Sequence, residues 1–150
     1  MNDHFPKHFE KNLYRIFGDE GASWYRKAPS LVRSCIDRWR LGNCRAMRAL
    51  SINLIYFAES PDHGAVVLKI GFPHPELFTE LEALAFFGDS HICKCYDSDR
   101  ENGATLLERL VPGHDLFSME DRSRQVEIGA GLIARLPVAL TGNESLPQFS

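Results

Sequence analysis

Apolar residues recur at helical spacing in the amino-terminal part of the chain. Between residues 5 and 17 they follow the repeat of an amphipathic helix, and the turn residues of segment 18–21 come next. A second helix is predicted to begin at Pro29 and Ser30, because proline is favoured in the first turn of a helix. Its apolar face consists of Leu31, Val32, Cys35, Ile36 and Trp39. Residues 1–38 therefore predict a helical amino-terminal extension.

From Trp39 the apolar pattern shortens into runs that are typical of strands. Residues 39–48 and 52–59 form two such runs, and the second is rich in β-branched and aromatic residues. A turn at residues 60–64 leads into a third run, which ends before Pro73. Three antiparallel strands in succession are the expected result.

The remaining segments alternate between helix and strand patterns. A helix is predicted over residues 76–87, and its apolar stripe consists of Leu77, Phe78, Leu81, Leu84 and Ala85. A strand at 91–96, a polar turn at 97–103, a strand at 104–110 and a final helix at about 119–136 follow. This order predicts an α+β fold, in which a five-stranded antiparallel sheet has one helix between its third and fourth strands.

Lys69 is the one charged residue inside the third strand pattern, which lies in the segment 64–73. A lysine in an apolar run is costly to bury unless a carboxylate or another anion meets its ammonium group. A glutamate on the next helix and the phosphates of a nucleotide would together meet this need, as they do in protein kinases. The spacing, 80 − 69 = 11 residues, favours Glu80, although periodicity alone leaves Glu82 and Glu76 open as partners.

Composition limits the classes of partner. The chain has 150 residues, of which 44% are apolar and 25% charged, and this suits one ordinary domain. Its net charge of −3 and pI of about 6.1 give no basic field, so binding to nucleic acid is not expected. There is no apolar leader and no run close to the ~20 residues of a membrane span, so a cytoplasmic protein without membrane contact is expected.

The four cysteines are too few and too irregularly spaced for a disulfide scaffold, and reduced thiols are expected. His91, Cys93 and Cys95 alternate along one predicted strand. Three ligands on one strand still need a fourth group of suitable geometry, so ordinary thiols are favoured and no metal site is expected.

The order of elements resembles the amino-terminal lobe of a protein-kinase-like fold, and a series of short motifs narrows the resemblance. They are Val67-Leu68-Lys69-Ile70-Gly71, Pro75-Glu76-Leu77, Glu80-x-x-Ala83-Leu84, Tyr96-Asp97-x-Asp99, Gly103-Ala104-x-Leu106-Leu107-Glu108-Arg109-Leu110, Pro112-Gly113-x-Asp115-Leu116 and Ala134-Arg135-Leu136. Together they look like the aminoglycoside phosphotransferase family, in its streptomycin and hydroxyurea kinase branch. The resemblance runs from about Trp24 to Ser150.

The resemblance implies a nucleotide site around Lys69. Lys69 would neutralise the α- and β-phosphate oxygens of ATP, and Glu80 would orient the lysine through a charge-assisted bond. Ser51, in the turn between the first two strands, would cover a phosphate in place of the glycine-rich loop of protein kinases.

The adenine would meet the end of the last strand. Backbone groups of Glu108, Arg109 and Leu110 would hydrogen-bond its edge. Leu68 and Leu107 would pack on the purine ring, although leucines in strands are as often simply core.

The same resemblance places the catalytic residues and the Mg²⁺ ligands in a second, carboxy-terminal lobe, with a His-Gly-Asp loop that this chain does not contain. Asp97 and Asn102 have the spacing of part of such a loop, but they are interpreted as a solvated hairpin turn. The expected organisation is an extension at 1–38, the kinase-like sheet and helix at 39–116, and a helix with the start of a linker at 117–150. No catalytic residue is expected in this chain.

The expected function is nucleotide binding within an ATP-dependent phosphotransferase of the antibiotic-resistance type, acting on a hydroxyl of a streptomycin-like aminoglycoside or of hydroxyurea. The chain is expected to be inactive alone. A second hypothesis is a truncated, non-catalytic lobe that acts as a binding or interaction module and self-associates through its exposed lobe interface. A third is a small α+β domain unrelated to kinases, which would lack the inserted helix.

Overall fold

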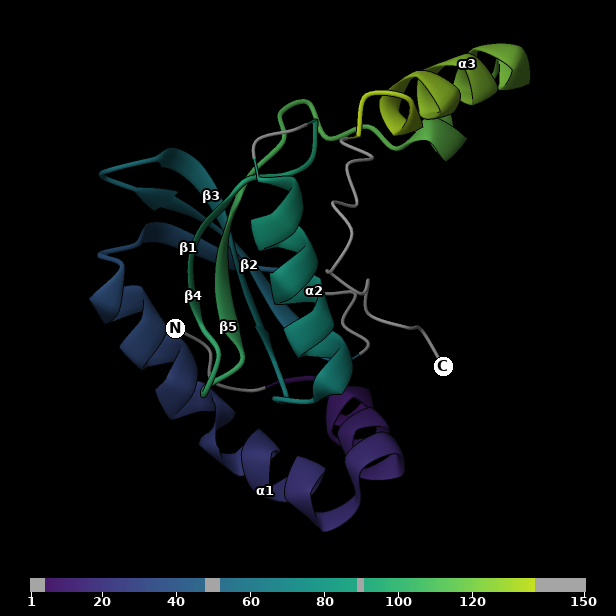
Figure 1. The fold of residues 1–150 in the computed structure, drawn as a ribbon. Helices are drawn as coiled ribbons and strands as arrows, with labels where there is room; N and C mark the ends of the chain where they lie inside the picture. The colour runs from purple at the N-terminus through teal and green to yellow at the C-terminus, as the bar shows by residue number, and fades with distance from the viewer. Residues whose placement is uncertain (1–4, 48–51, 89–90, 137–150) are drawn as a thin grey trace, which may run out of the picture.

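A computed structural model describes residues 5–47, 52–88 and 91–136 of the chain. Its elements are α1 (Lys7–Arg38), β1 (Gly42–Ala46), β2 (Asn53–Ser60), β3 (Gly64–Gly71), α2 (Pro75–Phe87), β4 (Cys95–Asp99), β5 (Ala104–Glu108), the short 3-10 helix η1 (Leu116–Ser118) and α3 (Arg122–Ile133). The five strands form one antiparallel sheet in the order β1-β2-β3-β5-β4 (Figure 1). This architecture confirms the predicted α+β fold of a kinase-like amino-terminal lobe.

The main hydrophobic core lies between α1 and one face of the sheet, which we call the α1 face. Successive side chains of a strand point to opposite faces, so every second residue of the central strands reaches this core. The buried residues are Leu54, Tyr56, Ala58, Val66, Leu68, Ile70, Ala104 and Leu106 from the sheet, and Phe9, Leu13, Trp24, Ala28, Val32 and Cys35 from α1. The opposite face, called the α2 face, carries Lys69 and is overlaid by α2 (Figure 1).

Helix α1 differs from the two helices that the sequence predicted. The first predicted helix ends where expected, because Gly18 adopts a φ of 58° that interrupts the helical backbone. The helix resumes at once, however, and Pro29 lies inside it instead of at a start. Trp24 and Ala28 are buried in the core between these two positions, and their packing accounts for the helical conformation that the turn residues obscured.

Strand β4 also lies further along the chain than predicted. It covers Cys95–Asp99, so Asp97 belongs to the strand and not to a turn. The hairpin turn follows it, and there the Asp99 carboxylate accepts hydrogen bonds from the backbone and side-chain nitrogens of Asn102, at 3.1 and 2.9 Å. An irregular register between Cys95 and Asp97 places Asp97 opposite Leu106, on the α1 face.

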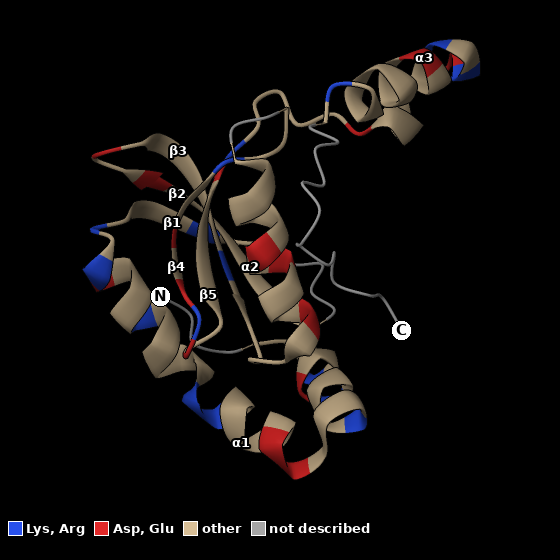
Figure 2. Cartoon of the chain, viewed as in Figure 1, with Lys and Arg blue, Asp and Glu red and all other residues tan. Residues whose placement is uncertain are grey.

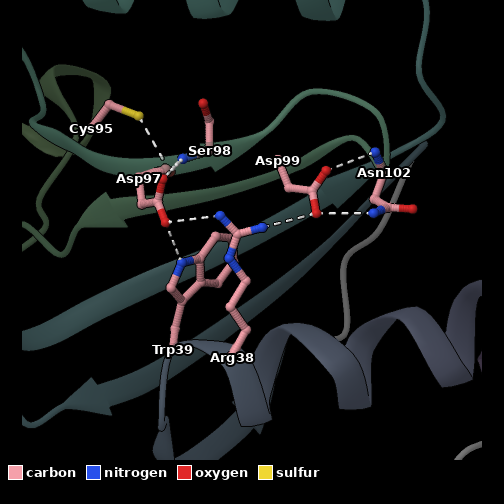
Figure 3. Close-up of polar contacts among 7 residues, drawn as sticks. All are labelled: Arg38, Trp39, Cys95, Asp97, Ser98, Asp99 and Asn102. Carbon is pink, nitrogen blue, oxygen red and sulfur yellow. Dashed lines mark hydrogen bonds and ion pairs between the residues drawn. The ribbon is translucent and has the colours of Figure 1, made fainter.

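The carboxylates of β4 hold the end of α1 (Figure 3). The indole Nε1 of Trp39 donates to Asp97 Oδ2 at 2.7 Å, and Arg38 forms ion pairs with Asp97 and Asp99 at 3.3 and 3.2 Å. Burial alone would raise the pKa of Asp97, but the hydrogen bonds from Trp39 and Ser98 and the charge of Arg38 together lower it. These polar strand residues thus attach α1 to the edge of the sheet.

The start of α2 packs closely on the ends of β3 and β5. The Gly71 amide donates to the Gly103 carbonyl at 2.9 Å, and Gly103 has a φ of +67°. A Cβ atom at Gly103 would collide with the Gly71 carbonyl oxygen and would lie 3.3 Å from a methyl group of Leu77 in the first turn of α2. Glycine is therefore required here by both conformation and space.

None of the helices in the described residues is long and apolar enough to cross a lipid bilayer.

We expect Gly103→Ala to destabilise the chain well beyond the cost of its positive φ. Gly64→Ala is the matched control, because Gly64 also has a positive φ, of +72°, but nothing lies within 4 Å of its added Cβ. The control should cost about 1 kcal/mol, and Gly103→Ala about 2–4 kcal/mol, because its added methyl group meets backbone. Equal changes in the free energy of unfolding, measured by urea denaturation, would contradict the close packing.

We expect the stabilisation from Asp97 to be lost in acid. Since the folded state lowers the pKa of this carboxyl, its contribution is fully present above the unfolded pKa of about 3.9 and disappears as the pH falls through the lower folded value. The difference in melting temperature between the wild type and Asp97→Asn should therefore be constant from about pH 7 to 5 and shrink below about pH 4. A difference that persists unchanged to about pH 3 would contradict this assignment.

Candidate functional site

The predicted ion pair between Lys69 and Glu80 is present and confirms the favoured spacing. Lys69 Nζ donates to both carboxylate oxygens of Glu80, at 2.6 and 2.5 Å. The side chain of Lys69 is only 17% exposed, whereas that of Glu80 is 40% exposed. Figure 2 shows acidic residues on α2 in front of strands that contain basic residues. The alternative partners lie elsewhere: Glu82 accepts from Arg100 at 3.3 Å, and the Glu76 side chain is 91% exposed.

The pair leaves Lys69 able to bind an additional anion. A lysine ammonium has three N–H donors, and the two oxygens of Glu80 lie to one side of it. A phosphate oxygen is the kind of acceptor that would complete the coordination, because charge-assisted hydrogen bonds to an anion are stronger than neutral ones. The arrangement thus fits an anion-binding site, in which a carboxylate holds the lysine ammonium group in place.

Two rows of side chains cross the α2 face around Lys69. Cross-strand partners point to the same face, and the register aligns Ile55, Lys69 and Thr105 in one row. The next row aligns Phe57, Val67 and Leu107, two residues along the strands from the first. This second row is apolar and lies about 6.7 Å from the lysine row, on the side toward Glu108.

Of the two alternatives for Leu68, the structure supports the core residue and not the purine contact, because this side chain is fully buried in the core on the α1 face. Leu68 adjoins Lys69 in a strand, so the two must point to opposite faces. The alternation of the strand thus contained the signal, and it indicates Val67 as the residue that accompanies Leu107 on the α2 face.

The segment after β5 is already partly engaged in backbone hydrogen bonds. The amide of Glu108 donates to the Lys94 carbonyl at 2.8 Å, and the amide of Arg109 donates to the Ala65 carbonyl at 3.3 Å. Among the described residues no hydrogen bond is formed by the amide of Leu110. Of the three amides predicted to bind the adenine edge, that of Leu110 is therefore the one without a hydrogen-bond partner in the described part of the chain.

The side chain of Arg109 makes a contact that the sequence did not predict. Its guanidinium carbon lies 4.3 Å from the centre of the Phe57 ring, a cation–π arrangement over the apolar row. The two residues are far apart in the chain, and Phe57 belongs to none of the motifs that carry the resemblance. Only the register of β2 against β3 brings Phe57 toward the end of β5.

Ser51, the predicted phosphate-covering residue, lies outside the described residues. Within the described part of the chain no three His, Cys, Asp or Glu side chains come together as a metal site. Burial raises the pKa of the Cys95 thiol, and the neighbouring Asp97 raises it further, so this cysteine is a poor thiolate donor. The Mg²⁺ ligands that the resemblance places in a second lobe remain a prediction.

Comparisons with known proteins agree with the geometry. No family model matches the chain. It is 32% identical over 133 residues to streptomycin 6-kinase of Streptomyces griseus and 30% identical over 131 residues to streptomycin 6-kinase of Streptomyces glaucescens. The resemblance to the aminoglycoside phosphotransferases is confirmed. These alignments cover 89% and 87% of this chain but only 43% of each relative, so the chain spans less than half the length of the curated relatives it matches.

Proposed function

We propose that this chain is the nucleotide-binding lobe of an ATP-dependent phosphotransferase whose acceptor is a hydroxyl of a streptomycin-like aminoglycoside. The observation that carries the proposal is the partly buried Lys69–Glu80 ion pair between the sheet and α2. The relatives named streptomycin 6-kinase favour the aminoglycoside acceptor over hydroxyurea, the other acceptor that the sequence motifs imply.

The proposed roles follow from the two rows on the α2 face. Lys69 binds inner phosphate oxygens, and Glu80 fixes the position of its ammonium. Val67 and Leu107 contact the purine ring on the apolar row, and the Leu110 amide donates to the edge of the base. Bound ATP would supply the phosphoryl group and Mg²⁺ would neutralise its oxygens. The ligands for the metal and the acceptor site would come from the second, carboxy-terminal lobe that the resemblance implies.

The test is the stabilisation of the chain by a non-hydrolysable ATP analogue. A ligand that binds only the folded state raises the melting temperature, and at about a hundred times its Kd the gain of ~2.7 kcal/mol corresponds to about 5–10 °C for a chain of this size. Lys69→Ala should abolish this rise. Lys69→Met should abolish it too while keeping the apolar stem of the side chain, which separates loss of charge from loss of packing.

Lys27→Met is the matched control, since Lys27 is an exposed lysine on α1. It should show the full nucleotide response. A response of Lys69→Met equal to that of the wild type would contradict the proposed phosphate contact, provided that circular dichroism shows both variants folded.

A second candidate function, an interaction module without catalysis, is favoured by apolar side chains beyond the sheet. The most exposed are Leu110, Val111, Phe117, Val126 and Ile133, which range from 60% to 93% exposed. Exposed apolar groups of this kind often mark an interface. This candidate predicts self-association in light scattering and no transfer of phosphate from ATP to streptomycin. A monomer that catalyses the transfer would exclude it.

A further inference from the structure

The connection between β3 and α2 determines where Glu80 lies relative to Lys69. Residues 72–74 form it, and Pro73 and Pro75 restrict its backbone, because proline fixes its own φ and limits the residue before it. Glu80 follows Pro75 by five residues (80 − 75 = 5), or about 7.5 Å along the helix. A stiff connection this close to Glu80 transmits any displacement to the ion pair.

Aromatic residues of α1 hold this connection. The ring of Phe17 stacks on that of Phe72, with centroids 4.4 Å apart and planes inclined by 24°. The same Phe17 ring meets the edge of His74 at 5.1 Å, and Trp24 meets Phe72 at 6.4 Å. Figure 1 shows the first limb of α1 lying beside the beginning of α2. The amino-terminal helix therefore contacts the connection directly.

Among the described residues, the His74 side chain does not hold the connection through hydrogen bonds. His74 precedes the first residue of α2, yet its side chain makes no capping hydrogen bond. Both ring nitrogens are buried and have no hydrogen-bond partner among the described residues, although Nε2 lies 3.7 Å from a carboxylate oxygen of the exposed Glu76. The His74 ring is thus positioned by packing, and Phe17 supplies the aromatic contact.

The opposite end of α1 is itself fixed. Arg38 and Trp39 bind the carboxylates of β4, and the apolar residues after Gly18, which are Trp24, Ala28, Val32 and Cys35, are buried against the α1 face of the sheet. Phe17 lies in the first limb of α1, before the break at Gly18, and the fully buried Phe9 and Leu13 attach this limb to the core. A limb held in this way can resist movement of α2.

We infer that Phe17 is a positioning residue for the Lys69–Glu80 ion pair and, through it, for nucleotide affinity. Phe17 lies in α1 and acts on Lys69 only through the connection and Glu80. The part that concerns affinity rests on the proposed nucleotide-binding function. The part that concerns the ion pair does not.

Nucleotide affinity provides the first test, measured by calorimetric titration of the 150-residue chain with a non-hydrolysable ATP analogue. Phe17→Ala should weaken binding about tenfold, whereas Phe17→Tyr, which keeps the ring, should stay within about twofold of the wild type. Val32→Ala is the control, because it truncates another buried α1 residue, 2% exposed, that lies further along the helix toward Arg38. It should lower stability without weakening binding more than about twofold.

A double-mutant cycle separates positioning from a general loss of structure. In a Glu80→Gln background the ion pair is already lost, so Phe17→Ala should weaken binding no further. An equal penalty in both backgrounds would overturn the inference, as would a penalty no larger than that of Val32→Ala. If circular dichroism shows that Phe17→Ala is unfolded, Phe17→Leu replaces it in the cycle, because leucine keeps most of the volume but not the ring. Phe17→Leu should then weaken nucleotide binding in the wild-type background and not in the Glu80→Gln background.

The rate at which Lys69 reacts with an acylating reagent gives a readout that needs no nucleotide. Mass spectrometry should show Lys69 reacting several times faster in Phe17→Ala than in the wild type or Val32→Ala, relative to the exposed Lys27, because a released amine is more accessible. An unchanged rate would overturn the inference. A raised rate in a chain that binds no nucleotide would instead support the positioning of the pair by Phe17 and contradict the proposed function.

Discussion

The burial of one ammonium group is the constraint on which the rest of the site depends. Lys69 lies in the middle of the sheet beside the apolar row of Phe57, Val67 and Leu107, and its side chain is 17% exposed. A charge in such a place is tolerated only with a partner, and Glu80 supplies it with both oxygens. Helix α2 must therefore lie across the α2 face at a position that keeps Glu80 within hydrogen-bond distance of Lys69. The close contact among Gly71, Gly103 and Leu77 and the stiff connection that follows β3 both serve that placement.

Much of this arrangement follows from local patterns in the sequence. Strand alternation and the two prolines before α2 predicted β3, α2 and the order of elements, and the spacing of 11 residues favoured Glu80 over its neighbours. Alternation also excludes Leu68 from the Lys69 face, and it therefore decides between the two alternatives that were left open for this residue.

Other features depend on contacts between distant segments and could not be predicted. The turn residues after Phe17 indicated the break at Gly18, but not that the helix resumes directly, since that depends on the burial of Trp24 and Ala28. Aspartate locally favours a turn, and Asp97 lies in a strand because Trp39 and Arg38 bind its carboxylate. The contact between Arg109 and Phe57 likewise exists only because β2 and β5 flank β3. Tertiary contacts outweighed local preference in each case.

The most direct measurement of the central claim, that Lys69 binds the phosphates of a nucleotide, uses an ATP derivative with an acyl group on its terminal phosphate. An amine close to the bound phosphates attacks the acyl carbon, keeps the acyl group as an amide and releases ATP, and mass spectrometry identifies the lysine. The account predicts acylation of Lys69 that excess ATP suppresses. In a control reaction with an acyl phosphate that lacks the nucleoside, Lys69 should not be acylated. Labelling confined to exposed lysines such as Lys27, with no ATP-sensitive modification of Lys69, would contradict it.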